Sequence, residues 1–423
     1  MWRVLRSIVE SSNERGLPIL IAPAQAPIAL VLASARLASD NGAGPSAAVM
    51  VEEERVWLTD WNRLLVVAAA HGMRPLLCRF LVGQTLVCPQ PEQTKVCATL
   101  QEFTQRNLRK NLWMTGELII LLRIFAEHGV NIIPFKGPTL AALAYGDLGL
   151  REFGDLDLLI AKTDFMKAQE LLMARGYQPE VTLNAKQAVI FAEACNAMAF
   201  WHPEKEISVE LHWELSPKYL PFSPDPVRLR GRMVPSHPGG QAVMTLSPED
   251  LLVYLCAHGA KHVWEKLIWI VDVAGLIQRH SNLDWPRVYD LAVEQRCERV
   301  LFLGLRLACD VTGVSAPSKM EKLMESDPES GRLAAKVIGR LLSDSNSRSS
   351  PSADSLFIYR LQRRWPDKIR ALSRMAITPS AADWLSYPKL RRFAWAYPLL
   401  RPLRLMSKLV RCSASDKQSI GSR

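Results

Sequence analysis

A pair of aspartates beside an apolar run is the feature of this sequence that most constrains its fold. The segment REFGDLDLLI, residues 151–160, places Asp155 and Asp157 two positions apart and continues with Leu158–Ile160, which reads as a buried strand. Residues i and i+2 of a strand point to the same face, so the two charges repel and are costly to desolvate. The usual compensation for such carboxylates is a hard divalent cation such as Mg²⁺.

Positive charge is concentrated at the C-terminal end of the chain. The 423 residues, enough for two or three domains, carry a net charge of +10. Residues 360–423 contain 15 Lys or Arg and three acids, whereas residues 1–359 together carry a net charge of −2. A basic tail of this kind indicates binding to RNA, an anionic membrane surface or an acidic partner, and a solvated helical face is the alternative interpretation.

The eight cysteines indicate reduced thiols. They form no C-x-x-C pair, so their spacing predicts neither a zinc site nor a disulfide framework. Free thiols are typical of the cytosol, and we therefore expect a cytoplasmic protein.

The N-terminal region contains an uncharged run of 20 residues, Gly16–Ala35, which is long enough for a membrane span. The run contains three prolines and is preceded by acidic residues, unlike the basic start of a signal peptide. Ordinary domain sequence begins near Met50. We therefore expect no transmembrane span, and we interpret residues 1–52 as a disordered leader or the product of a start codon assigned too early.

Helical patterns flank a shorter region with strand periodicity. The segments DWNRLLVVAAAHGMRPLLCRFLVG and LRKNLWMTGELIILLRIFAEHG precede this region, and SPEDLLVYLCAHGAKHVWEKL follows it. The pattern predicts an α+β fold, with a small mixed sheet flanked by helical segments. The segments expected after the leader are an N-terminal helical segment (53–128), a sheet domain that carries the site (129–245), a helical domain (246–342), a Ser-rich linker (343–359) and the basic tail (360–423).

The expected sheet brings carboxylates and a glycine turn together. A strand over Asn131–Phe135 leads into a turn at Lys136–Pro138 and a helix from Thr139. In a later strand over 206–215, apolar residues alternate with polar ones that include Glu210. If this strand pairs with the aspartate strand, three carboxylates converge on one metal site.

Phosphate-binding features lie beside these carboxylates. Helix N-termini bind phosphate through free N–H groups and the helix dipole, and Lys136 and Arg151 add positive charge on either side of the glycine turn. Carboxylates that hold a metal, together with a glycine turn and cations, predict a nucleoside triphosphate site.

The segment FKGPTLAALAYGDLGLREFGDLDLLI resembles an uncharacterised bacterial nucleotidyltransferase family of the polymerase-beta-like nucleotidyltransferase superfamily. The resemblance extends over DWNRLLVVAAAHGMRPLL, VELHWEL and AHGAKHVWEKLIWIVDVAGLI, and so covers roughly residues 55–310. An Asp-x-Asp pair alone is a weak signal, whereas four segments in the same order are a much stronger one.

The resemblance implies the superfamily's topology for the sheet domain and a nucleotidyltransferase activity. An enzyme of this kind moves a nucleoside monophosphate from an NTP such as ATP to a hydroxyl acceptor, unknown here, and releases pyrophosphate with Mg²⁺ or Mn²⁺. The implied metal-binding and catalytic residues are Asp155, Asp157 and Glu210, and the implied nucleotide contacts are Lys136, Gly137, Thr139 and Arg151.

One departure from the family pattern leaves other functions open. Pro138 stands where the superfamily usually has Ser or Gly, and it offers neither an N–H nor a hydroxyl to phosphate. This favours a non-catalytic nucleotide-binding scaffold, although the intact carboxylates argue against it. A protein-modifying nucleotidyltransferase of the toxin or antitoxin type is the alternative among enzymes.

Histidines downstream of the carboxylates are candidates for supporting roles. His212 follows Glu210 by two residues on the same strand face, and His258 and His262 share one helix face. Gly259 stands where a metalloprotease motif needs Glu. We expect His212, His258, His262 and Asp272 to support the metal ligands or line the acceptor pocket, and packing is the favoured interpretation for the helical histidine pair.

Overall fold

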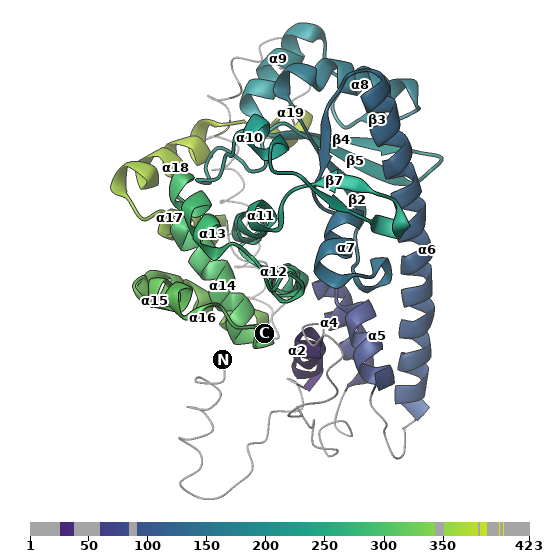
Figure 1. Ribbon diagram of the computed structural model, residues 1–423, viewed down its shortest axis with the longest axis vertical. Coiled ribbons are helices and arrows are strands. Elements are labelled where there is room, and N and C mark those ends of the chain that lie inside the picture. Colours follow the sequence, from purple (N-terminus) through teal and green to yellow (C-terminus); the bar gives the residue numbers. More distant parts are fainter. Residues whose placement is uncertain are drawn as a thin grey trace, which may run out of the picture.

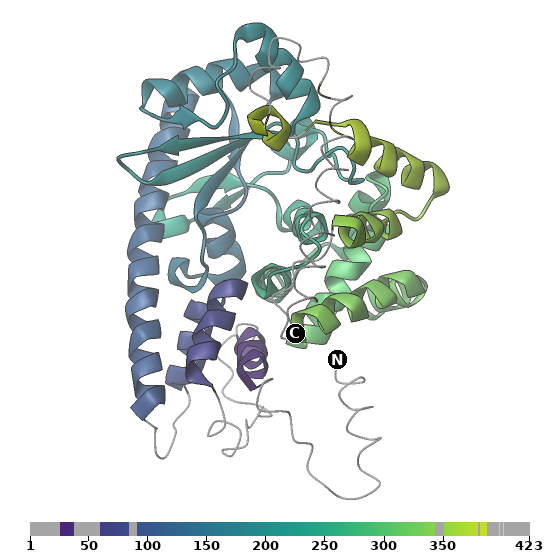
Figure 2. The same cartoon turned by 180° about the vertical axis from the view of Figure 1, so that it is seen from behind.

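The computed structural model describes residues 26–37, 60–83, 91–342, 351–379, 381–386, 397 and 401. A small sheet lies between the long helix α6 (Pro91–Glu127) on one side and a group of C-terminal helices on the other (Figure 1). The view from behind shows the same three-part arrangement (Figure 2).

Five strands form a mixed sheet in the order β1-β2-β5-β4-β3. Strands β2 and β5 run parallel, and the other neighbours are antiparallel. A separate hairpin of β6 and β7 joins the edge at β1, where the Thr245 hydroxyl donates to the Pro134 carbonyl oxygen at 2.5 Å. The strands are β1 (Ile132–Pro134), β2 (Asp155–Ile160), β3 (Gln178–Pro179), β4 (Ala197–His202), β5 (Ile207–His212), β6 (Val234–Ser236) and β7 (Val243–Thr245).

In chain order, helices precede the sheet, lie between its strands and follow it. Before the sheet come α2 (Ala26–Leu37), α4 (Trp61–His71), α5 (Arg74–Gly83) and α6, and between its strands lie α7 (Pro138–Tyr145), α8 (Phe165–Ala174) and α9 (Ala185–Ala194). The later helices are α10 (Pro226–Arg230), α11 (Pro248–Lys261), α12 (Leu267–Arg279), α13 (Trp285–Glu294), α14 (Glu298–Thr312), α15 (Ser318–Glu325), α16 (Pro328–Leu342), α17 (Pro351–Leu361), α18 (Trp365–Ile377) and α19 (Ala381–Ser386). Short 3₁₀ turns occur at Leu148–Leu150, Lys162–Asp164 and Pro238–Gly240.

The five-stranded sheet has one apolar face and one face that carries the acids. Leu156, Leu158, Val209 and Leu211 are buried with residues of α6, α8 and α9. Leu159, on the opposite face, packs instead with the core that includes α7, α11 and α12. Because strand residues alternate between faces, the acidic residues of β2 and β5 lie on the face directed toward these helices.

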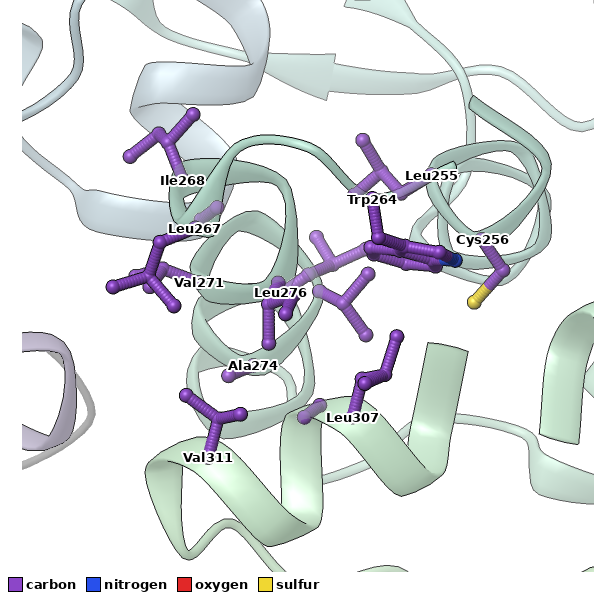
Figure 3. Close-up of a cluster of buried hydrophobic side chains, with 14 of the residues drawn as sticks. Leu255, Cys256, Trp264, Leu267, Ile268, Val271, Ala274, Leu276, Leu307 and Val311 are labelled. Carbon is purple, nitrogen blue, oxygen red and sulfur yellow. The ribbon is translucent and has the colours of Figure 1, made fainter. Parts of the chain in front are cut away.

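The corner between α11 and α12 is built around a buried tryptophan (Figure 3). Val263 and Trp264 have φ of 53° and 55°, a left-handed conformation that is strained for residues other than glycine. The Trp264 side chain is fully buried, and a Cβ at Gly259 would lie 2.5 Å from its ring. Packing of this ring therefore holds the strained corner, and with it the orientation of α12 against α11.

The prediction of an α+β fold with a small mixed sheet and flanking helices is confirmed. The strands expected near residues 131–135, 155–160 and 206–215 correspond to β1, β2 and β5. The helix expected after the glycine turn is α7, which begins at Pro138. Proline is tolerated there because the first N–H groups of a helix have no intrahelical acceptor.

Helix α2 lies in the region expected to be a disordered leader. Leu30, Val31 and Ala35 are buried in a core that also contains residues of α4, α5 and α14. Pro27 falls in the first turn of the helix, where proline is tolerated. Over α2 the structure therefore differs from that expectation, and residues 1–25 and 38–59 lie outside the described residues.

The C-terminal region contains more packed structure than a linker and a tail would suggest. Helix α17 begins inside the expected Ser-rich linker, and α18 and α19 lie inside the expected basic tail. Trp384 stacks on Tyr397 with ring centroids 4.5 Å apart and contacts Phe191 of α9 at 5.4 Å. Residues 343–350 and most of 387–423 lie outside the described residues, and the expected segment boundaries stay predictions.

Membrane-spanning helices and disulfides are absent from the described part of the chain. Within those ranges, no helix combines the length and the apolar character needed to cross a membrane. The described cysteines are free, namely Cys78, Cys97, Cys195, Cys256, Cys297 and Cys309.

Removing residues 1–49 is expected to lower the melting temperature by several degrees, because the core side chains covered by α2 become exposed to water. Thermal unfolding of the full chain and of a chain that begins at Met50 measures this difference. Val31→Asp, at a fully buried position, should destabilise the full chain, whereas Val66→Asp, at a position 62% exposed, should not. Equal melting temperatures for all four proteins would show that α2 contributes nothing to stability.

Candidate active site

Two carboxylates and an imidazole meet where β2 and β5 run side by side. The parallel register places Asp157 opposite Glu210, and Leu159 opposite His212. His212 Nε2 lies 3.0 Å from Asp157 Oδ1 and 3.2 Å from Glu210 Oε2. One donor atom from each of these three residues lies within 4.8 Å of the others. The two strands therefore pair as the sequence predicts, and the pairing brings a histidine into the group.

Asp157 is the buried centre of this group. Its Oδ1 atom accepts from His212 and lies 2.7 Å from the Lys136 ammonium, whereas its Oδ2 atom is buried without a hydrogen-bond partner among the described residues. Burial would raise the pKa of Asp157, but Lys136 and His212 together hold it well below its usual value. Asp157 is therefore ionised and has one oxygen available for a ligand.

The other two carboxylates differ from Asp157 in environment. Burial raises the pKa of Asp155, and the negative charge of Asp157 raises it further. Glu210 has a side chain that is 36% exposed, and a hydrogen bond from His212 is the main cause of its lowered pKa. Asp155 shares a strand face with Asp157 but does not join the compact group, so its predicted role in metal binding stays a prediction.

The glycine turn packs directly on the start of β2. Gly137 has φ of 54°, and a Cβ at this position would lie 3.1 Å from the Asp155 carbonyl oxygen. A side chain here would therefore be strained and would press on the strand. Thr139 is buried, and its hydroxyl donates to the Lys136 carbonyl oxygen at 3.0 Å. In this position Thr139 closes the turn, and its predicted nucleotide contact stays a prediction.

Arg151 and Asp272 form a buried pair next to the site. Arg151 Nε and Nη2 donate to the two Asp272 oxygens at 2.8 and 3.0 Å, and the Tyr145 hydroxyl donates to Asp272 Oδ1 at 2.7 Å. Asn107 and Asn111 of α6 hold the Arg151 carbonyl oxygen. These contacts join α6, α7 and α12, so a phosphate contact by Arg151 or an acceptor contact by Asp272 would compete with them.

A continuous series of ring contacts connects the carboxylates to α11 and α12. Phe135 contacts His212 at 5.2 Å between ring centroids and Tyr254 at 5.0 Å. Tyr254 is in turn next to His258, at 5.8 Å. His258 and His262 then contact each other at 4.9 Å and contact Trp269 at 5.5 and 5.0 Å. The helical histidine pair therefore faces the site, and it packs against an aromatic ring as expected from the sequence.

Both helical histidines are held in their neutral form. Burial lowers the pKa of His258 well below its usual value, and it lowers the pKa of His262 to about 3. Positive charge on Lys136 and Lys261 contributes in the same direction. Neutral imidazoles at these positions can bind ligands by hydrogen bonds but add no positive charge.

Lys261 is a residue of the site that the sequence reasoning missed. It is partly exposed, three residues after His258 on the same helix face, and its ammonium has no hydrogen bond or ion pair with the described residues. Burial and the charge of Lys136 lower the pKa of Lys261, whereas Glu210 and Asp157 raise it. The signal in the sequence was AHGAKH, where Lys261 follows His258 by three residues and so lies near it on the helix surface.

Comparison with known proteins gives a match to a family model. A family model described as an uncharacterised nucleotidyltransferase matches residues 58–313, which include every site residue named above. No curated protein and no solved structure matches the chain.

Asp272→Leu is expected to lower the free energy of unfolding by about 3–5 kcal/mol, because it leaves the Arg151 guanidinium buried without its partner. Urea denaturation measures the effect. The double variant Arg151→Met/Asp272→Leu should recover much of the loss, and Glu294→Leu, which breaks an exposed pair with Arg287, should change stability little. If Asp272→Leu is as stable as the unmodified chain, the pair does not hold the helices together.

Proposed function

The chain belongs to the uncharacterised nucleotidyltransferase family, and from this membership we propose that it transfers a nucleoside monophosphate from an NTP to a hydroxyl acceptor. Nucleotidyl transfer as a general activity rests on the family. The dependence on Mg²⁺ or Mn²⁺, the use of ATP and the nature of the acceptor are our inference from the residues of the site.

The proposal rests on the buried Oδ2 atom of Asp157, which has no hydrogen-bond partner among the described residues. A buried carboxylate oxygen without a partner is costly. Asp157, Glu210 and His212 each place one potential ligand atom within 4.8 Å of those of the other two. Carboxylate oxygens are the preferred ligands of Mg²⁺, and Mn²⁺ also accepts imidazole. The donor set therefore fits a divalent cation, held by Asp157 and Glu210 with Asp155 as a further ligand.

A cation bound there would supply Lewis-acid stabilisation of the charge that develops on the transferred phosphoryl group and on the leaving pyrophosphate. His212 Nε2 lies between Asp157 and Glu210 and orients both carboxylates. Glu210 is partly exposed to solvent, so we place it toward the acceptor hydroxyl. In this mechanism the protein mainly positions charged groups, as expected for phosphoryl chemistry.

Lys261 and Lys136 are our candidates for the triphosphate contacts. Arg151 is already bonded to Asp272 through two of its nitrogens, whereas Lys261 has no hydrogen bond or ion pair with the described residues and lies close enough to the site for the charges of Asp157 and Glu210 to act on its pKa. Lys136 sits at the glycine turn and can exchange Asp157 for a phosphate oxygen by rotation of its flexible side chain. The triphosphate would then lie between the glycine turn and the C-terminal end of α11.

Asp157→Asn and Asp155→Asn are each expected to reduce transfer by more than about 100-fold, because they remove metal ligands. Asp155→Asn also removes like-charge repulsion and should cost little stability, whereas Asp157→Asn leaves the Lys136 ammonium buried without its ion-pair partner and should lower the free energy of unfolding. The assay incubates the protein with each labelled NTP, Mg²⁺ and cell extract, and records which molecule becomes labelled. Asp290→Asn, at an exposed position of α13, is the matched control. Wild-type turnover in both site variants would overturn the metal-site assignment.

Lys261→Met should weaken binding of a non-hydrolysable NTP analogue with Mg²⁺ by about 10-fold or more, because hydrogen bonds to charged groups contribute about 1.5–3 kcal/mol. Isothermal titration calorimetry measures the affinity. Lys319→Met, an exposed lysine of α15, is the control for the loss of one positive charge. Unchanged affinity in Lys261→Met would remove this residue from the phosphate site.

The close pair of Lys136 and Asp157 favours a second candidate function. A lysine that already neutralises the central carboxylate at 2.7 Å makes the site less dependent on a metal. In this case the chain would bind a nucleotide without transferring it. If an NTP binds in calorimetry but no molecule of the extract becomes labelled, the protein is non-catalytic. If the label is found on a protein, the chain is a protein-modifying enzyme.

A further inference from the structure

Helix α18 carries a stripe of large apolar side chains that faces solvent. Trp365, Ile369 and Leu372 are 67%, 62% and 45% exposed. Their spacing of i, i+4 and i+7 places them along one side of the helix. Exposed apolar residues scattered singly are ordinary, but a row of three on one helix needs a function or a cover.

The buried side of α18 holds the helix in this orientation. Asp367 and Ala371 are buried, and Asp367 accepts from Arg296 at 3.5 Å and from Arg370 at 3.3 Å. Arg374 Nη1 donates to the Lys218 carbonyl oxygen at 2.7 Å. Helix α18 lies at the outer edge of the molecule in both views, on the side away from α6 (Figures 1 and 2).

Positive charge flanks the apolar stripe. Residues 360–379 contain six Lys or Arg and one acid. Arg364 and Arg370 are exposed, and the Lys368 ammonium lies 5.4 Å from the Trp365 ring centroid and 4.9 Å from that of Tyr359. A helix with a Trp-containing apolar stripe bordered by cations has the composition of helices that lie in the interface of an anionic membrane.

We propose that α18 binds the surface of an anionic phospholipid bilayer. Trp365, Ile369 and Leu372 would enter the boundary between headgroups and acyl chains, while the flanking cations contact lipid phosphates. Lipid is favoured over RNA because single-stranded RNA is bound by stacking on aromatic rings, and neither Ile369 nor Leu372 offers one. This surface is independent of the proposed nucleotidyl transfer, which requires none of these residues.

The test is flotation of the full chain with two kinds of vesicle, phosphatidylcholine alone and phosphatidylcholine mixed with phosphatidylglycerol, at low and high salt. The unmodified chain should float with the anionic vesicles at low salt and less so at high salt. The triple variant Trp365→Ser/Ile369→Ser/Leu372→Ser should reduce the bound fraction by about 10-fold or more. Arg364→Gln/Arg370→Gln should reduce the salt dependence, because two of the six basic residues in 360–379 are removed.

The matched control replaces two exposed apolar residues away from α18. Val189→Ser/Val227→Ser, at positions 63% and 68% exposed on α9 and α10, should float as well as the unmodified chain. Thermal unfolding of each variant checks that it is folded.

Three results would overturn the proposal. The first is that the unmodified chain fails to float with anionic vesicles at low salt, and the second is that the triple variant floats equally well. The third is that the chain binds polyuridylate in a filter assay but no vesicle, which would assign the basic surface to RNA. None of these measurements uses an NTP, so their failure is distinct from failure of the proposed transfer.

Discussion

The buried pair of Arg151 and Asp272 joins the segment that precedes β2 to helix α12, and the site depends on how these two parts are placed. Arg151 precedes β2, the strand of the aspartates, and Asp272 lies on α12, which follows the histidine-bearing helix α11. Helices α12 and α7 approach so closely at Gly275 that a Cβ there would lie 2.7 Å from the Ala144 carbonyl oxygen. With polar and steric contacts at the same junction, the glycine turn, the carboxylates and α11 are held in one arrangement.

The site combines carboxylates of β2 and β5 with one lysine near the C-terminal end of α11. The strands β2 and β5 supply three carboxylates, of which only Asp157 is fully buried and paired with a lysine. Helix α11 supplies Lys261 and two histidines that burial keeps neutral. Such an arrangement suits the proposed substrate, because a cation would be attracted to the carboxylates and the phosphates to Lys261.

The proposed lipid surface and the proposed active site lie on different parts of the chain. Helix α18 contacts the body through Arg296 and Lys218, neither of which belongs to the carboxylate group. Binding at α18 therefore leaves the carboxylates and Lys261 accessible. If both proposals hold, the protein would carry out transfer while attached to a membrane surface, which would favour acceptors that also reside there.

Local sequence patterns were sufficient to predict β1, β2 and β5, the glycine turn and the strand positions of the acids. The alternation in β5, the glycine turn before α7 and the aspartate pair at the start of β2 all depend on neighbours within a few residues, so the sequence by itself determined them. The register of β2 against β5 was not fixed in this way, because a slip of two residues keeps Leu158 and Leu211 on one face and the acids on the other, and the tertiary structure decided it.

Only the tertiary structure decided which charged groups are available at the site. Arg151 is paired with Asp272, 121 residues away along the chain, whereas Lys261 has no ion-pair partner in the part of the chain that the structure describes, and nothing local to either residue distinguishes them. Tertiary structure also decided the fate of α2. Its apolar, proline-containing segment forms a helix whose side chains are buried against α4, α5 and α14. Long-range pairing and burial depend on residues distant in sequence, and they leave no periodic signal around the residue that they constrain.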